Sequence, residues 1–301
     1  MVPTLAGVVL LIFFLFKLFG GDPAQILAGQ VATQEQIDSI RRELGLDQPW
    51  YVQLWIFVKE IVTFNWGQSW ITREQVSHIF LTRLPATLTI TIPILLLEAA
   101  MAIPTAMLVA YYRGTLLDRT VMAICVAAMS ISFLVYIIVG QYFFGFQLGW
   151  FPVQGWSDSF VRNLATYAPL PILLAALVGL APQTRLYRSF FLDETKNDYV
   201  RTARAKGLSE PAILRKHVLR NALVPVVTNI SLLIPGVFVG SFLLEIFFSI
   251  PGLGREIYLA VNRSDYPVIQ AVTIYLSVLT MLINLTADVL YSFVDPRIQL
   301  R

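Results

Sequence analysis

The sequence predicts an all-helical protein that crosses a membrane six times. Hydrophobic residues make up 56% of the 301-residue chain and charged residues only 14%, and the mean hydropathy is +0.68. A soluble domain carries roughly 25% charged residues, so this chain has too little polar surface for a water-facing globule. Six apolar runs approach or exceed the ~20 residues that a helix needs to cross a bilayer: 2–19, 86–111, 120–146, 167–184, 222–248 and 267–293.

The first run, 2–19, carries Lys17 near its end, where a long side chain can reach the lipid headgroups. A cleaved signal peptide is the alternative, but no basic stretch precedes the run and no small-residue cleavage site follows it. A shortened start would also account for the missing basic residues. Gly20 to Pro23 then predict an exit of the chain from the membrane.

The connection 20–84 is long, carries charges of both signs and is expected to face outward. Thr33 and Gln36 form a capping box that predicts a helix, and Gly45 can end it. Asp47 offers a second N-cap. The following segment suits the membrane interface through its aromatic residues Trp50, Tyr51, Trp55 and Phe57. The connection is either a solvated cap on the spans or a docking surface for an external partner.

Three apolar runs each contain one carboxylate, which usually faces protein or a water-filled cavity. Glu98, near the middle of the second run, is equally suited to line a pathway or to tie two helices together. Glu245 and Asp288 lie nearer helix ends, where a structural role is favoured. Gly236 and Gly240 form a GxxxG step that predicts close helix packing, within the chain or between subunits.

The sequence contains no recognisable enzyme site. A Walker A loop needs a Gly-Lys pair, and the chain has none. Its two histidines, His78 and His217, are predicted on opposite sides of the membrane, so they cannot share a metal ion or a hydrolytic triad. The protein is therefore expected to have no catalytic residue and no metal site of its own.

The most informative segment is the connection 185–221 between the fourth and fifth runs, which is too long for a simple turn. Asn197 or Asp198 can cap a short helix, and Gly207 can break it. Ser209 can then begin a second helix that merges with the fifth run. The pattern predicts two short helices joined by a bend at the glycine.

The first of these short helices is basic, with Arg201, Arg204 and Lys206 around Ala203 and Ala205. A basic amphipathic helix can rest on anionic lipid headgroups. The alternative is a rigid lever that inserts into a cytoplasmic protein, with the small residues allowing close approach. Composition and spacing leave both alternatives open.

The distribution of positive charge predicts that both termini are cytoplasmic. With six spans the termini share one side, and the loops and tail on that side hold thirteen Lys and Arg residues. The two short loops opposite hold only Arg162, Arg255 and Arg263. Positive residues are retained on the cytoplasmic side of membrane proteins.

The bent segment resembles the EAA loop of binding-protein-dependent ABC importer permeases, in the variant of the first permease of the dipeptide, oligopeptide and nickel group. The matching residues are Tyr199 to Ser209 (YVRTARAKGLS) and Leu219 to Pro225 (LRNALVP). Further motifs of that family follow in the same order along the chain: Gly21-Asp22-Pro23, Leu44 to Pro49, Leu84 to Thr87, Pro251 to Gly254, Asp265-Tyr266-Pro267 and Asp295-Pro296-Arg297.

The chain departs from the family pattern in the bent segment and in the outer connection. Arg201 and Thr202 replace the usual Glu and Ala, and His217 and Arg220 replace an apolar residue and a proline. In the outer connection, Asn65 to Ser69 replace the usual Gly-Asp-Leu-Gly-x-Ser, which weakens any docking role carried over to that loop.

The resemblance implies a type I ABC importer transmembrane domain in the bacterial inner membrane. It divides the chain into a first helix (1–19), an external region (20–84) and a permease core (85–301) with the coupling loop at 185–221. The implied partners are a second homologous permease, two cytoplasmic ATPases that use ATP and Mg²⁺, and an external solute-binding protein. The residues expected to couple to the ATPase are Tyr199, Arg201, Ala203, Arg204, Ala205, Gly207, Leu208 and Ser209.

The cargo implied by the resemblance ranges over dipeptides, longer peptides, glutathione, nickel chelates and haem. Two other classes remain as alternatives. An ion-coupled carrier or channel would need a relay of acids and usually an internal repeat, neither of which is evident. A membrane sensor or assembly factor would use the basic loop as a docking patch.

Overall fold

The computed structural model describes residues 2–19, 21–29, 32–63 and 65–294, and this part of the chain is helical apart from turns and one isolated bridge. The α-helices are α1 (Val2–Phe19), α2 (Pro23–Ala28), α3 (Gln34–Glu43), α4 (Trp50–Val62), α5 (Val76–Tyr111), α6 (Leu116–Met129), α7 (Phe133–Gly140), α8 (Phe160–Arg162), α9 (Pro169–Glu194), α10 (Asp198–Ala205), α11 (Glu210–Ile213), α12 (Leu219–Val239), α13 (Phe242–Phe247), α14 (Leu253–Asn262) and α15 (Tyr266–Val294). Three π-helical segments extend or join them: η1 (Gln141–Gln147), η2 (Asn163–Tyr167) and η3 (Leu214–Val218).

Within the described residues, four helical stretches are long and apolar enough to cross a membrane. They are α5, α9, the stretch from α11 to α13 (Glu210–Phe247), and α15. A fifth results if α6 and the α7–η1 helix, which meet at 90°, form one broken span. The apolar part of α1, Pro3–Leu18, is shorter than these. The protein is therefore a multi-pass helical membrane protein, and the six-span count stays a prediction.

Several helices differ in extent from the predicted spans. α5 begins at Val76, inside the predicted outer connection, and α9 continues to Glu194, ten residues past the predicted end at Thr184. Charged residues mark where a helix leaves the apolar core of the bilayer, and a helix does not have to end there. Because α9 ends at Glu194, the first ten residues of the connection 185–221 are helix and not loop. The run 120–146 was expected as one span but breaks between α6 and α7.

The outer connection contains the predicted first helix. The capping box at Thr33 is present, with the Thr33 N–H donating to Gln36 Oε1 at 3.0 Å, and Gly45 follows the end of α3 in a left-handed conformation (φ +64°). The prediction for Asp47 was wrong, because Pro49 holds the N-cap position of α4. Proline fixes its own φ and suits the start of a helix, so it sets the boundary that Asp47 was expected to set.

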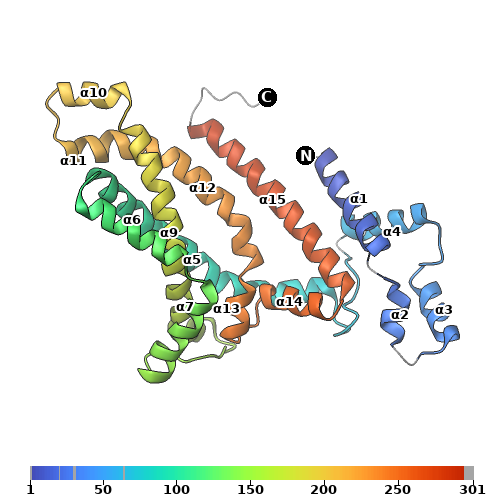
Figure 1. Ribbon diagram of the computed structural model, residues 1–301. Helices are drawn as coiled ribbons and strands as arrows, with labels where there is room; N and C mark the ends of the chain where they lie inside the picture. Colours follow the sequence, from blue (N-terminus) through green and yellow to red (C-terminus); the bar gives the residue numbers. More distant parts are fainter. Residues whose placement is uncertain (1, 20, 30–31, 64, 295–301) are drawn as a thin grey trace.

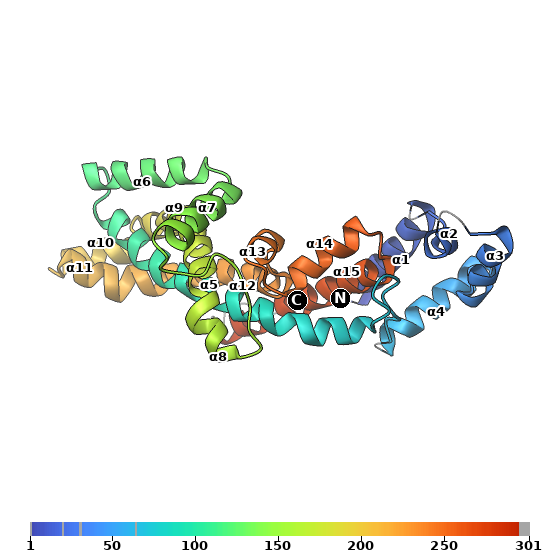
Figure 2. The same ribbon diagram turned by 90° about the horizontal axis from the view of Figure 1, so that it is seen from below.

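The helices form an elongated body (Figures 1 and 2). α5 packs along α9, and α12 contacts α5, α9 and α15. The α1–α4 region lies at one end, where α1 contacts α15 and α4. At another extremity the short helices α10 and α11 project beyond the long helices (Figure 1). This arrangement places the bent segment at the ends of α9 and α12.

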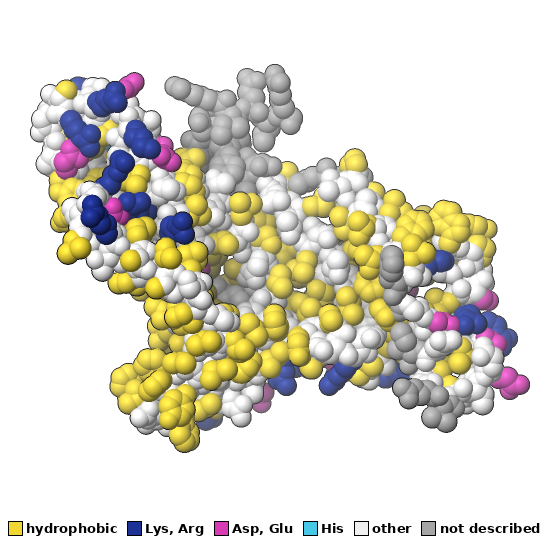
Figure 3. Space-filling model, viewed as in Figure 1, with side chains coloured by type: hydrophobic (Ala, Val, Ile, Leu, Met, Phe, Trp, Pro, Cys, Tyr) yellow, Lys and Arg dark blue, Asp and Glu magenta, His cyan; other side chains and the backbone are white. Residues whose placement is uncertain are grey.

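The surface carries large hydrophobic side chains over most of the long helices (Figure 3). Lys and Arg side chains gather over the α10–α11 end of the face shown. An apolar surface of this extent is suited to lipid or to another membrane subunit. The basic end is the part of the molecule expected to meet water.

Candidate coupling site

The start of α10 is held by one carboxylate at the end of α9. Glu194 Oε2 accepts hydrogen bonds from the Tyr199 hydroxyl at 2.5 Å and from Asn197 Nδ2 at 2.8 Å. Burial raises the pKa of Tyr199 above its ordinary value, and the hydrogen bond to Glu194 raises it further. The phenol therefore stays protonated and donates. This contact fixes α10 to the long helix α9.

The bend between α10 and α11 depends on Gly207, whose φ is +80°. Only glycine adopts this left-handed conformation without strain. The Gly207 N–H donates to the Arg204 carbonyl at 2.9 Å, which closes the end of α10. Open space surrounds the position of a Cβ at Gly207, so a side chain there would project outward into the surface that a partner would contact.

An ion pair braces the two sides of the bend. Arg204 Nε and Nη2 donate to the two oxygens of Glu210 at 2.6 and 3.1 Å. The hydrogen bond to Glu210 raises the pKa of Arg204, so the pair is fully charged at neutral pH. Exposed pairs contribute roughly 0.2–1 kcal/mol, and a bidentate geometry is the most effective form. The brace sets the angle between α10 and α11.

One face of α10 packs into the core of the chain. Val200 is fully buried and Ala203 is 5% exposed, in a cluster built from α5, α9, α11, η3 and α12. The cluster includes Ala106, Tyr187 and Val218. α10 therefore packs against a core that three long helices, α5, α9 and α12, share.

The expectation that Ala203 is open to a partner was wrong, because its small side chain fits against the chain's own core. Tyr199 is half-buried. The other predicted coupling residues, Arg201, Arg204, Ala205, Gly207, Leu208 and Ser209, are all exposed. These six residues, with Lys206, form the coupling surface.

We expect Ala203→Leu to loosen α10 from the core, because inserting extra methylene groups into a packed site costs about 1–3 kcal/mol. Co-purification of the partner ATPase should fall, while membrane insertion stays normal. Ala205→Leu, on the exposed face of the same helix, is the control for core packing. Equal heat stability of the two variants would contradict a packing role for Ala203.

Exchanging the charges of the brace tests it directly. Arg204→Glu alone should lower ATPase stimulation about fivefold, since it removes the pair and places two acids together. Adding Glu210→Arg should restore most of the activity by rebuilding the pair in reverse. No recovery in the double variant would show that Arg204 acts by touching the partner, not by setting the bend.

A buried ion pair between α6 and α9, near the coupling surface, was not predicted from the sequence. Asp118, at the start of α6, is 5% exposed and accepts from Arg188 Nε and Nη2 of α9, both at 2.8 Å. The Gly114 N–H also donates to Asp118 at 2.8 Å. The sequence signal that could have indicated this pair is the position of Asp118, an acid in the first turn of the apolar helix α6. The pair ties α6 to the base of the coupling segment.

Glu98 packs against α9 at Gly179, where a Cβ would overlap its carboxylate. No hydrogen bond or ion pair to the Glu98 carboxylate occurs among the described residues. The interhelical hydrogen bond expected as one alternative is therefore not observed in the described chain, and a close fit to glycine is observed instead. A role in the pathway stays a prediction.

Glu245, for which a structural role is expected, lies in a buried hydrogen-bond network. Its side chain is fully buried, and it accepts from the Thr87 hydroxyl at 2.9 Å and from the Arg255 N–H at 2.7 Å. Thr87 Oγ1 in turn accepts from the Leu253 N–H at 2.7 Å. The carboxylate thus caps α14 and joins α5, α13 and α14.

Glycines make room for this carboxylate. A Cβ on Gly252 would lie 2.5 Å from Glu245 Cδ, and one on Gly254 3.1 Å from Oε2. This close approach gives a physical reason for the Pro251 to Gly254 motif. Of the expected GxxxG step, Gly240 packs closely within the chain: it follows the end of α12 with φ +77°, and a Cβ there would lie 2.7 Å from Thr87 Cγ2 of α5. No described atom lies within 4 Å of a Cβ at Gly236, and a subunit contact there stays a prediction.

A third buried acid fastens the outer connection to the start of α15. Asp265 is 4% exposed and accepts from the Ser69 hydroxyl at 2.5 Å and from the Trp70 N–H at 3.0 Å. The motifs around these residues therefore meet in space. The side chain of Asp288 and the motif Asp295-Pro296-Arg297 lie outside the described residues.

The fold defines a multi-pass membrane protein with a bent, basic helix pair exposed at one extremity. The chain belongs to the family of binding-protein-dependent transport system inner membrane components, whose model matches residues 102–300. The model of the N-terminal part of such membrane components matches residues 2–91. The protein is accordingly a permease component of an ABC importer and not an enzyme.

Three relatives cover nearly the whole chain. The di/tripeptide transport system permease protein DppB of Pseudomonas aeruginosa (strain UCBPP-PA14) is 35% identical over 324 residues, covering 99% of this chain and 96% of its own. The glutathione transport system permease protein GsiC of Escherichia coli (strain K12) is 37% identical over 300 residues, with the same coverage. GsiC of Salmonella typhi is 36% identical over 299 residues, again with 99% and 96% coverage.

Proposed function

We propose that this chain forms one half of the translocation pathway of an ATP-driven importer for dipeptides, oligopeptides or glutathione. In this proposal the chain has six spans, counting α1 and the broken α6–α7 helix, so both termini lie on one side of the membrane, and the excess of Lys and Arg in the loops of that side supports the cytoplasm. The partners are a second homologous permease, two ATPases that bind Mg²⁺ and ATP, and an external solute-binding protein. The chain itself binds no cofactor. The first helix (1–19), the external region (20–84) and the core (85–301) are its functional divisions.

The observation that carries the proposal is the combination of an exposed coupling surface with a buried anchoring face on one helix. Arg201, Arg204 and Leu208 are exposed, whereas Val200 is fully buried in the cluster of α5, α9 and α12. An ATPase that grips the exposed face moves the long helices through the buried one. The Gly207 bend and the Arg204–Glu210 brace keep the lever rigid.

Transport then follows from coupled equilibria. ATP and cargo must each bind the inward-facing and outward-facing states with different affinity, because a ligand with equal affinity shifts no equilibrium. ATP binding draws the two ATPases together, and the coupling helices follow. Peptide-type cargo is supported by two relatives, the di/tripeptide permease DppB and the glutathione permease GsiC.

Uptake into vesicles tests the proposal. The complex reconstituted with its solute-binding protein should accumulate a labelled dipeptide or glutathione only with hydrolysable ATP. Blocking hydrolysis in the ATPase should abolish accumulation. Uptake driven by an ion gradient without nucleotide would contradict the proposal and support a carrier.

A further inference from the structure

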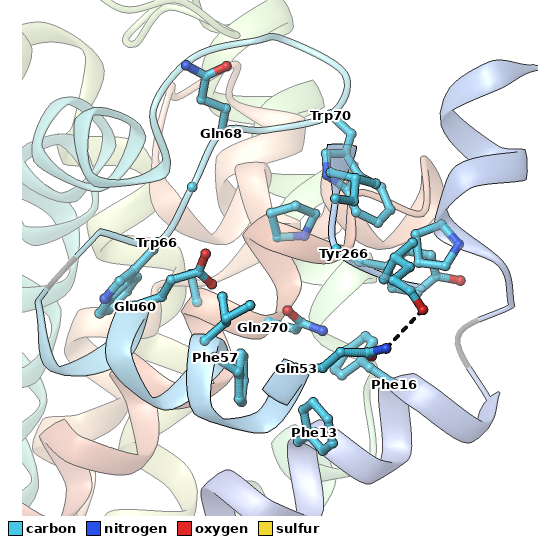
Figure 4. Close-up of a pocket in the computed structure, with 18 of the residues that line it drawn as sticks. Phe13, Phe16, Gln53, Phe57, Glu60, Trp66, Gln68, Trp70, Tyr266 and Gln270 are labelled. Carbon is cyan, nitrogen blue, oxygen red and sulfur yellow. Dashed lines mark hydrogen bonds between the residues drawn. The ribbon is translucent and has the colours of Figure 1, made fainter. Parts of the chain in front are cut away.

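A cavity of about 660 Å³ lies between α1, α4, the start of α15 and the loop around Trp66 to Trp70 (Figure 4). Its volume is in the range of small-molecule sites. It lies away from the coupling surface, in the region that α1 to α4 form with α15 (Figure 1). Neither the helix-packing nor the coupling role described above uses it.

One part of the wall is aromatic. Phe13 of α1 lies 5.9 Å from Phe57 of α4 between ring centroids, and Phe16 lies 5.5 Å from Tyr266 of α15. Trp70 lies 5.6 Å from the same tyrosine. Such rings bind an acyl chain through dispersion and burial of apolar surface.

Another part of the wall carries charge. Glu60 of α4 lines the cavity (Figure 4) with its side chain exposed to solvent, and no hydrogen bond or ion pair to its carboxylate occurs within the described chain. Desolvation by the surrounding chain raises the pKa of this carboxyl, although part of the side chain stays exposed to solvent. Lys17 of α1 supplies a positive charge to the wall and donates to Gln53 at 3.0 Å. The same wall also holds Asp22, which is paired with Arg41, and the exposed Arg73. The cavity thus combines carboxylates, cations and an apolar surface.

The surroundings indicate membrane lipid as the source of a matching ligand. α15 is a candidate span, α1 is an apolar helix, and the cavity lies where the end of α1 meets the start of α15. The outer face of α4 exposes Trp50, Tyr51 and Trp55, at 52%, 59% and 69%. Exposed Trp and Tyr of this kind lie at the headgroup level of a bilayer. A lipid headgroup therefore has access to the charged part of the cavity.

We propose that the cavity binds one phospholipid with an amine-bearing headgroup, with its ammonium on Glu60, its phosphate beside Lys17 and an acyl chain along Phe13 and Phe57. A primary ammonium donates up to three hydrogen bonds, which a quaternary ammonium cannot do. The site therefore distinguishes phosphatidylethanolamine from phosphatidylcholine. The site also distinguishes phosphatidylethanolamine from phosphatidylglycerol, whose headgroup has no cation to pair with Glu60.

Native mass spectrometry of the full-length chain, purified with the subunits that remain attached and supplied with each lipid, tests this site. Phosphatidylethanolamine should be retained, and Glu60→Gln should weaken its retention about tenfold through loss of a charge-assisted hydrogen bond. Glu43→Gln, exposed at the end of α3 and outside the cavity, is the matched control and should retain lipid normally. Gln270→Trp, which fills the cavity without changing its charge, should also lose the lipid.

Equal retention by the wild type and Glu60→Gln would overturn the proposal, and so would equal retention of phosphatidylglycerol. Binding of the dipeptide alanyl-phenylalanine in place of lipid, sensitive to Glu60→Gln, would instead make the cavity a cargo site and contradict it. Because the measurement uses neither ATP nor uptake, its failure leaves the proposed transport function untouched.

Discussion

Gly207→Asp is expected to abolish recruitment and stimulation of the partner ATPase while leaving membrane insertion intact. The substitution costs about 1 kcal/mol of backbone strain at φ +80°, which is tolerable for Asp. Its larger effect is at the surface, where a Cβ points into open space and the new carboxylate would stand at the centre of the basic coupling surface. We expect at least a tenfold loss of ATPase stimulation, which corresponds to about 1.4 kcal/mol of coupling.

The control for this variant must carry the same strain away from the coupling surface. Gly149 also has a left-handed backbone (φ +63°) with open space around its Cβ position, and it lies between η1 and α8. Gly149→Asp should therefore recruit the ATPase normally. The lever assignment is wrong if Gly207→Asp recruits and stimulates the ATPase as well as this control does.

Glu245→Ala is expected to give the largest loss of stability. It removes a buried carboxylate and leaves the Thr87 hydroxyl and the Arg255 N–H without their acceptor. Unsatisfied buried donors and the resulting cavity together cost about 3 kcal/mol or more. The midpoint of heat inactivation of the purified complex should fall by several degrees.

Glu245→Gln separates hydrogen bonding from packing. It keeps the volume of the side chain and one acceptor oxygen, so its loss of stability should be well below that of the alanine variant. Equal losses for the two variants would mean that both carboxylate oxygens are needed as acceptors. Normal stability of Glu245→Ala would contradict its role as the cap that joins α5 to α14.

Local signals in the sequence predicted local structure well. The capping box at Thr33, the bend at Gly207 and the start of the second helix at Ser209 all depend on residues within a few positions of one another. The sequence does not predict how far α5 and α9 extend, because charged residues mark the membrane boundary and not the end of a helix. Intrinsic helix propensity is a weak guide to where a helix ends, because tertiary packing decides the boundary.

The partners of the buried acids could not be predicted from the sequence. Asp118 and Arg188 are 70 positions apart, and Thr87 and Glu245 are 158 apart. Spacing rules for helices act over three or four residues and carry no information at that separation. The sequence identified Glu245 as an acid with a structural role, but only the fold identifies the helix that it caps.

Position-specific cross-linking at the coupling surface tests the central claim most directly. The native cysteine, Cys125, is buried, so cysteines introduced at the exposed Leu208 and Val161 react selectively. Val161 lies in α8, just before the start of α9, whereas the other end of α9 leads into α10. The Leu208→Cys variant should capture the ATPase subunit, with a yield that changes when ATP is added, and Val161→Cys should not. Capture of no ATPase from position 208, under conditions in which the assembled complex transports, would contradict the account.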